Sequence, residues 1–176
     1  MKKLAWSGKI TAGVAVLILS AMTVSVANAQ VLFTQHDDVR AFDITTGEGH
    51  QTGVATGRIS GTTFVKFHFT ITGPPDVNGA LPIAFNNQVI VTDINGDQIF
   101  FNNTGTGAFH VGLPGDVFQG TGGPLTGTYV LTGGTGRYRS WTVGTSFKYS
   151  AIFTNPPLAG TLGTVYVKVS TTSEDD

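Results

Sequence analysis

The sequence predicts an all-β protein, folded either as an antiparallel barrel or as a β-sandwich. Gly, Thr, Val and Phe dominate the chain after residue 29, and no stretch repeats apolar residues at helical spacing. Between residues 54 and 72, apolar and polar residues alternate, as in strands with one buried face. Short strand candidates recur along the chain between turns rich in Gly, Pro and Asn, which is typical of barrels and sandwiches.

The first strand candidate is 32–44. The alternating segment 54–72 is either a strand pair or one long bent strand, because Gly61 near its centre allows a bulge or a reversal. Its odd-numbered apolar residues, Val65, Phe67 and Phe69 among them, are expected to face the core. The remaining strand candidates are 88–93, 98–102, 107–111, 127–132, 142–153 and 161–170.

A hairpin is predicted where Asn95-Gly96 separates two apolar runs, Val89-Ile90-Val91 and Ile99-Phe100-Phe101. This dipeptide readily adopts the positive φ angles of a tight turn. The alternating acidic and amide residues Asp93, Asn95 and Asp97 also resemble the start of a calcium loop, but the Glu that completes such a loop is missing. A plain hairpin is therefore expected.

Residues 1–29 are expected to be a cleaved secretory signal peptide. Lys2 and Lys3 precede an uncharged apolar run at 10–26, which Ala27-Asn28-Ala29 follows as a small-x-small cleavage site. The secreted or periplasmic product would begin at Gln30 and keep no membrane span. One β-barrel domain is expected at 30–170, and 171–176 is expected to be a flexible acidic tail.

The composition limits the partners of the mature chain. Its 147 residues are enough for one domain with a real core. Seven basic residues face eleven acidic ones, a net charge of −4, so nucleic acid and anionic membranes are poor partners. The chain has no Cys, which removes disulfides, thiol catalysis and thiolate metal sites.

Two ordered motifs resemble a known family. Asn95-Gly96-Asp97-Gln98-Ile99-Phe100 is followed by Thr104-Gly105-Thr106-Gly107, and Thr132-Gly133-Gly134-Thr135-Gly136-Arg137-Tyr138 comes later. This order is similar to bacterial secreted relatives of the allene oxide cyclase and dirigent barrels, over residues 53–169. The resemblance implies an eight-stranded antiparallel barrel, often a homotrimer, with a lumen that holds an apolar ligand in the plant enzymes.

The match has a clear departure, because Arg139-Ser140-Trp141-Thr142 stands where relatives usually have a small-residue segment. The functional residues of the plant proteins cannot be placed on this sequence, so no catalytic residue is assigned. Fold can carry over without activity.

The ligand-binding candidates are Arg58, Lys66, His68, Arg137 and Tyr138. Arg58, Lys66 and His68 share one parity and would hold a carboxylate or enolate if they pointed into the lumen. The outward orientation is expected, because the odd face offers the better core. Arg137 and Tyr138 follow a Gly-rich connection that lacks the Lys and βαβ context of a phosphate loop, and they are expected to pack over a barrel end.

The sequence predicts no cofactor and no metal site. Its four histidines, His36, His50, His68 and His110, show no metal-ligand spacing, and no Gly-x-Ser-x-Gly element supports a hydrolase. The expected function is binding of a small apolar or amphipathic ligand. The alternatives are an isomerase or cyclase of the allene oxide cyclase or dirigent type, and a structural or adhesive envelope module without a ligand.

Overall fold

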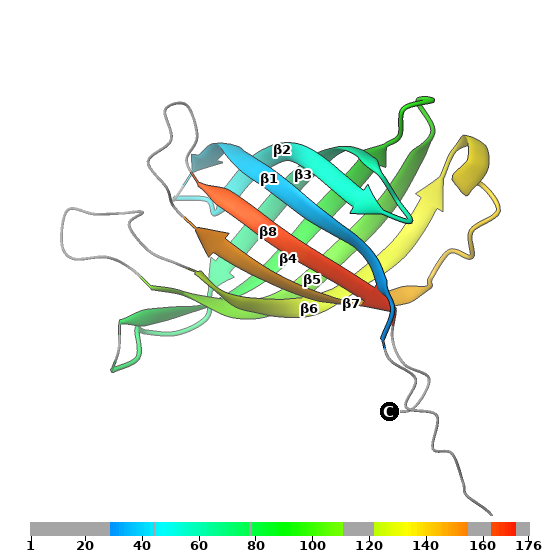
Figure 1. Cartoon of the computed structure of the whole chain (residues 1–176). Coiled ribbons are helices and arrows are strands. Elements are labelled where there is room, and N and C mark those ends of the chain that lie inside the picture. Colours follow the sequence, from blue (N-terminus) through cyan, green and yellow to red (C-terminus); the bar gives the residue numbers. More distant parts are fainter. Residues whose placement is uncertain (1–28, 44, 78, 111–121, 155–162, 172–176) are drawn as a thin grey trace, which may run out of the picture.

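The computed structural model describes residues 29–43, 45–77, 79–110, 122–154 and 163–171. They form one closed antiparallel barrel in which each strand pairs with the next and β8 pairs with β1 (Figure 1). The eight strands are β1 (Val31–Asp43), β2 (Glu48–Gly57), β3 (Gly61–Ile71), β4 (Ala80–Thr92), β5 (Gln98–His110), β6 (Gly122–Gly134), β7 (Ser146–Thr154) and β8 (Thr164–Thr171). The predicted barrel is confirmed, and the β-sandwich alternative is wrong.

Two sequence predictions concern segments that the structure does not describe. The signal peptide expected at 1–29 lies outside the described residues except for Ala29, and so does the acidic tail after Thr171. The one helix in the described residues is the short 3₁₀ turn η1 (Gly136–Tyr138) between β6 and β7. No helix within these described ranges is long and apolar enough to span a membrane.

The alternating segment 54–72 is a strand pair, because the chain reverses between the end of β2 and the start of β3. β4 and β5 are both longer than predicted. β5 runs without a break through Thr104-Gly105-Thr106-Gly107, where two strands were expected. Gly105 faces inward and leaves room for the ring of Phe85, since a Cβ there would collide with that ring. Packing inside the barrel therefore overrides the weak strand propensity of glycine.

The two ends of the barrel are built differently. At one end lie the β2–β3 turn, the β4–β5 hairpin, η1 and both ends of the described chain (Figure 1). We call this the η1 end. At the opposite end lie the β1–β2 and β3–β4 connections, and there β5 and β7 end and β6 and β8 begin.

The β4–β5 hairpin is confirmed, with a loop of five residues between the paired Thr92 and Gln98. The side chain of Asp93 organises the loop, because its Oδ1 accepts hydrogen bonds from the backbone N–H of Asn95 (2.8 Å) and Asp97 (3.0 Å). Gly96 has φ = +84° and donates its N–H to the Asp93 carbonyl at 3.0 Å. The glycine therefore supplies the left-handed conformation that closes the loop.

Gly96→Val is expected to cost about 1 kcal/mol or more of unfolding free energy, since a β-branched residue is strained at this φ. A Cβ at Gly96 meets nothing within 4 Å, so the loss would come from the backbone alone. Asn95→Val is the matched control, because no non-glycine residue in the described chain has a positive φ. Urea denaturation of both variants measures the difference, and equal midpoints would contradict this account of the loop.

Candidate functional site

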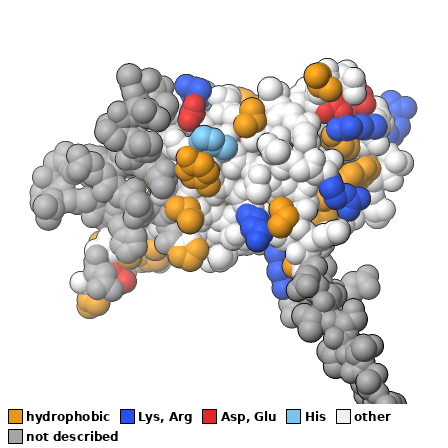
Figure 2. All heavy atoms as spheres, viewed as in Figure 1, with side chains coloured by type: hydrophobic (Ala, Val, Ile, Leu, Met, Phe, Trp, Pro, Cys, Tyr) orange, Lys and Arg blue, Asp and Glu red, His pale blue; other side chains and the backbone are white. Residues whose placement is uncertain are grey.

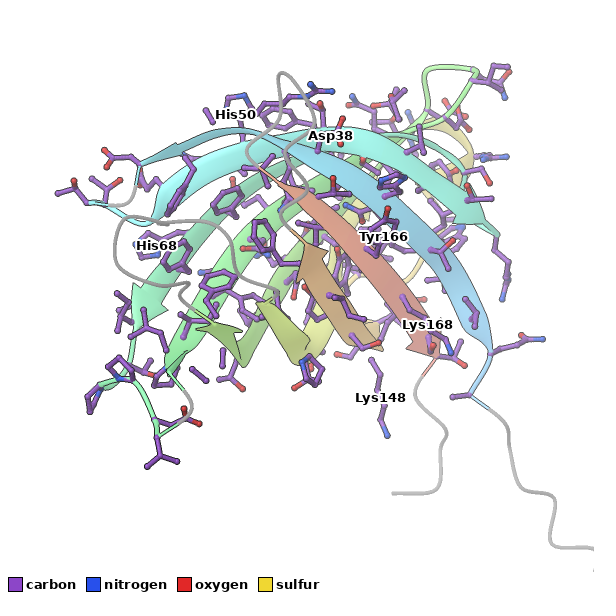
Figure 3. The ribbon with its side chains drawn as sticks, turned by 60° about the vertical axis from the view of Figure 1, so that its left-hand side comes forward. Asp38, His50, His68, Lys148, Tyr166 and Lys168 are labelled. Atoms are coloured by element: carbon purple, nitrogen blue, oxygen red, sulfur yellow. The ribbon has the colours of Figure 1, made fainter. Side chains whose placement is uncertain are left out.

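Three of the predicted ligand-binding residues lie outside the barrel. Lys66 and His68 are exposed on the outer face of β3, as the parity of the strand predicts, and Arg58 is exposed in the turn before β3. His68 stands opposite Glu48 of β2, and Lys66 opposite His50. Figure 3 labels His50 and His68 on this outer side. The structure does not bring these three candidates together at one point.

The other two predicted residues, Arg137 and Tyr138, form a latch at the η1 end. The Arg137 Nε lies 2.8 Å from the Asp93 Oδ2, and its guanidinium lies 4.7 Å from the centre of the Tyr138 ring and donates to the Tyr138 hydroxyl. The backbone N–H of Arg137 donates to Asp97 Oδ2 at 3.0 Å. Tyr138 is buried in the core, as expected for a side chain that packs over a barrel end.

The latch accounts for both motifs that the sequence singled out in this region. Asp93 and Asp97, the carboxylates of the calcium-like spacing, bind the hairpin loop and Arg137. Of the three glycines in the Gly-rich connection, only Gly136 has a positive φ, +50°. A Cβ on Gly136 would collide with Asp97, and a Cβ on Gly134 would collide with Tyr138. These residues hold the β4–β5 hairpin against η1.

The inward-facing side chains fall into three zones along the barrel axis. Next to the η1 end is a packed floor whose members are at most 1% exposed: Phe33, Ile59, Val91, Ile99, Phe101 and Leu131. Next along the strands comes a polar layer: Gln35, Asp37, Gln51, Thr63, Asn87, Asn103, Tyr129 and Tyr149. At the opposite end is a phenylalanine collar: Phe42, Phe67, Phe69, Phe109 and Phe153.

The polar layer centres on Asp37 of β1, which is fully buried. Its Oδ1 accepts a hydrogen bond from the Thr63 hydroxyl, and its Oδ2 accepts one from the Gln35 side-chain amide. Burial raises the pKa of the Asp37 carboxyl, although these two hydrogen bonds oppose the shift. The lumen therefore holds an acid that ionises less readily than a surface aspartate.

Gly53 makes the Asp37–Thr63 contact possible. In the sheet register Gly53 of β2 lies between Asp37 of β1 and Thr63 of β3. A Cβ on Gly53 would collide with the Asp37 side chain and with the backbone of His36. The missing side chain lets residues of two non-adjacent strands meet across β2.

Two tyrosines extend the polar layer to the other side of the barrel. The Tyr129 hydroxyl of β6 donates to Gln35 Oε1 at 3.3 Å, and the rings of Tyr129 and Tyr149 lie 5.4 Å apart. Burial raises the pKa of both phenols, and the side chain of Asn103 partly offsets this through a hydrogen bond. Both tyrosines therefore keep their protons at neutral pH and serve as hydrogen-bond donors.

Three buried amide oxygens in the polar layer have no hydrogen-bond partner in the described structure: Gln51 Oε1, Asn87 Oδ1 and Asn103 Oδ1. Asn87 and Asn103 are direct neighbours across β4 and β5, and Tyr129 follows on β6. Buried acceptors without a donor are costly, at about 1–3 kcal/mol each. Their clustering at one level of the lumen is the feature of the barrel that most resembles a binding site.

The phenylalanine collar forms a chain of ring contacts at the end opposite η1. Phe42 lies 5.1 Å from Phe69, Phe69 lies 5.3 Å from Phe109, and Phe109 lies 5.7 Å from Phe153. All five collar rings are partly exposed although they pack against the core. Among the described residues, the inward-facing side chains are therefore more accessible at this end than in the floor, whose members are at most 1% exposed.

The charges are separated between the inside and the outside of the barrel. Every Lys and Arg in the described residues is exposed, and several such side chains are visible on the surface in Figure 2. Lys148 and Lys168, labelled in Figure 3, belong to outward-facing positions of β7 and β8. Among side chains that the structure describes, the polar layer contains one acid and no basic residue.

Sequence reasoning missed the whole polar layer. A signal was present, because each member has the same parity as its buried apolar neighbours. Gln35 and Asp37 lie between Phe33 and Val39 on one face of β1, and Asn87 lies between buried residues of β4. A polar residue at an inward position of a strand marks a polar lumen. The same residues broke the apolar pattern from which strands were predicted.

The pH dependence of stability tests the environment of Asp37. Burial in the folded state raises the pKa of the Asp37 carboxyl above its ordinary 3.8. The contribution of this carboxyl to the stability of the folded state is therefore largest at low pH and is lost as the pH rises through the pKa of the folded state. Asp37→Asn removes this loss. The stability of the variant relative to the wild type should therefore increase from pH 4 to pH 8 in urea denaturation.

The matched control for this prediction is Asp38→Asn. Asp38 lies on the outer face of β1, where it pairs with Arg40 at 2.9 Å. If the stability of Asp37→Asn relative to the wild type instead falls as the pH rises, the folded state lowers the pKa of Asp37 and this account is wrong.

No protein-family model, curated protein or solved structure matches this chain. Its function is therefore inferred from the lumen.

Proposed function

We propose that the barrel binds a small amphipathic ligand in its lumen, with the polar part of the ligand at the polar layer and the apolar part against the phenylalanine collar. The observation that carries this proposal is the set of three buried amide oxygens without a donor, on Gln51, Asn87 and Asn103. A ligand that donates hydrogen bonds to them recovers the free energy that their burial costs.

The arrangement of the zones supports this orientation. The floor is sealed and covered by Tyr138, so we expect a ligand to reach the polar layer from the end that carries the partly exposed collar. Aromatic rings provide a large apolar contact area, and binding sites commonly combine such a lining with a few polar groups. The lumen offers both along one axis.

An isomerase or cyclase is the second candidate, and a separate observation favours it. Asp37 and the hydroxyls of Tyr129 and Tyr149 place an acid of raised pKa and two hydrogen-bond donors in one buried lumen. Such a set is suited to guiding proton transfer in a reactive intermediate. If this is the function, an epoxide that cyclises spontaneously to a racemate should give one enantiomer with the wild type and a racemate with Asp37→Asn, by chiral chromatography.

Binding is tested with N-phenyl-1-naphthylamine, a neutral probe whose fluorescence increases in apolar surroundings. We expect saturable binding to the wild type that Ala151→Trp weakens at least tenfold, because Ala151 faces the lumen from β7. Ile152→Trp is the matched control, since Ile152 is 54% exposed on the outer face. Circular dichroism establishes that each variant folds, and Ala151→Phe is the smaller replacement if tryptophan does not fit.

Two results would contradict the binding proposal. One is failure of the probe to bind a folded wild type, and the other is equal loss of binding in the Ala151 and Ile152 variants. Either result would favour the alternative function, a structural envelope module without a ligand. Native mass spectrometry of protein purified from its own source provides an independent test, because a ligand that co-purifies adds its mass to the barrel.

We also propose that the protein is exported after cleavage before Gln30. The support is the sequence of the first 29 residues, which has the basic start, apolar run and small-residue site of a signal peptide. The intact mass of the exported protein should match a chain that begins at Gln30. A mass that includes residues 1–29 would contradict export by this route.

A further inference from the structure

We infer that the ligand's polar head is an uncharged hydrogen-bond donor such as a vicinal diol, and that the lumen rejects anionic heads such as carboxylates. The inference rests on the proposed function and adds to it the chemical class of the ligand. Two independent features of the polar layer carry it: the unpartnered acceptors, and the absence of a basic side chain among the described residues that face the lumen.

Some hydrogen-bonding groups of the polar layer have partners within the protein, and others have none. The donors of Thr63, Gln35 and Tyr129 already have acceptors within the protein. The oxygens of Gln51, Asn87 and Asn103 have no donor. The unpartnered groups that the polar layer leaves for a ligand are therefore acceptors, and they need a donor, which a hydroxyl supplies and an ester, ether or carboxylate does not. Because three acceptors are unused, a head with two hydroxyls fits better than a head with one.

The charge distribution argues against an anionic head. A carboxylate buried at this level would lie in the same layer as the Asp37 carboxyl and would find no Lys, Arg or buried His among the described side chains. Burying an unpaired charge is costly, and a second negative charge nearby increases the cost. Arg58, Lys66 and His68 could hold a carboxylate only if they faced the lumen, and all three are outside the barrel.

An ammonium head is less suitable than a neutral one. Both oxygens of the Asp37 carboxyl already accept hydrogen bonds, from Thr63 and from Gln35. A buried cation needs an ionised and available partner to offset its desolvation. A neutral hydroxyl needs only the unpartnered amide oxygens.

The test is competition between N-phenyl-1-naphthylamine and ligands that share one ten-carbon chain. The series is 1,2-decanediol, methyl decanoate, decanoate and decylamine, at pH 7.5 and below micelle formation. We expect the diol to displace the probe at a concentration about tenfold lower than each of the others, which corresponds to one or two net hydrogen bonds. Chain burial is the same throughout, so the head group decides the order.

Two pairs of variants identify the groups responsible. Asn103→Leu and Asn87→Leu should reduce the preference for the diol over methyl decanoate to about threefold or less, because each removes an unpartnered acceptor. Asn102→Leu and Asn86→Leu are matched controls, since these neighbours point outward and are exposed. They should retain the tenfold preference. Asp37→Asn should narrow the gap between the diol and decanoate.

The possible outcomes separate this inference from the function on which it rests. If the probe binds but decanoate or decylamine competes as well as the diol, the inference is wrong and the binding proposal stands. Equal competition by the diol and methyl decanoate, or equal effects of Asn103→Leu and Asn102→Leu, also overturns it. If neither the probe nor any decyl compound binds, the proposed function fails and the inference fails with it.

Discussion

Phe101→Ala should destabilise the barrel by about 3–5 kcal/mol, the cost of removing a large aromatic side chain from a core that cannot collapse around the space. Phe101 is 1% exposed, and its ring centre lies 5.9 Å from that of Phe33, 5.5 Å from that of Tyr129 and 6.2 Å from that of Phe147. These partners come from β1, β6 and β7, so one truncation loosens contacts across the floor.

Phe64→Ala is the matched control for this prediction. Phe64 lies on the outer face of β3 and is 44% exposed, so its loss should cost under about 1 kcal/mol. Urea denaturation measures both losses, provided that the slope of the unfolding free energy against urea concentration is the same in each variant as in the wild type. Similar losses at the two positions would mean that the floor is not the main source of stability.

The sequence was most informative where one face of a strand is simply apolar. The alternation around Val65, Phe67 and Phe69 predicted which face of β3 is buried, and the Asn95-Gly96 turn predicted the β4–β5 hairpin. These features depend on contacts within a strand or between neighbours, which local patterns encode. The number of strand candidates and the resemblance of the two motifs predicted a barrel, and the structure confirms the closed sheet.

The sequence was least informative about the lumen, for two physical reasons. Inward polar residues such as Asn87 interrupt apolar alternation, so the first half of β4 did not resemble a strand. The contacts that give these residues a role also cross the barrel. Tyr129 meets Gln35, which is 94 positions earlier in the chain, and Thr63 meets Asp37 across Gly53. No local pattern reports a pairing of this kind.

The contacts of the polar layer are therefore best tested by measuring how the effect of one substitution on stability depends on a second substitution. Thr63→Val should cost about 1.5–3 kcal/mol near pH 8, because it leaves a buried and more fully ionised carboxyl of Asp37 with one donor fewer. The replacement keeps the shape of the side chain. Thr62→Val is the control, since Thr62 is the exposed neighbour on the outer face of β3.

The same substitution should cost less when Asp37 carries no charge. In the Asp37→Asn background, or at a pH low enough to protonate Asp37, the Thr63 hydroxyl donates to a neutral group, and the cost should fall to about 0.5–1.5 kcal/mol. A double-mutant cycle measured by urea denaturation at both pH values isolates this difference. Equal costs in all backgrounds would show that Thr63 contributes only packing. A coupling that appears only when Asp37 is ionised would establish that the Thr63 hydroxyl stabilises the buried Asp37 carboxylate. Thr63 reaches Asp37 because Gly53, which lies between them on β2, has no side chain.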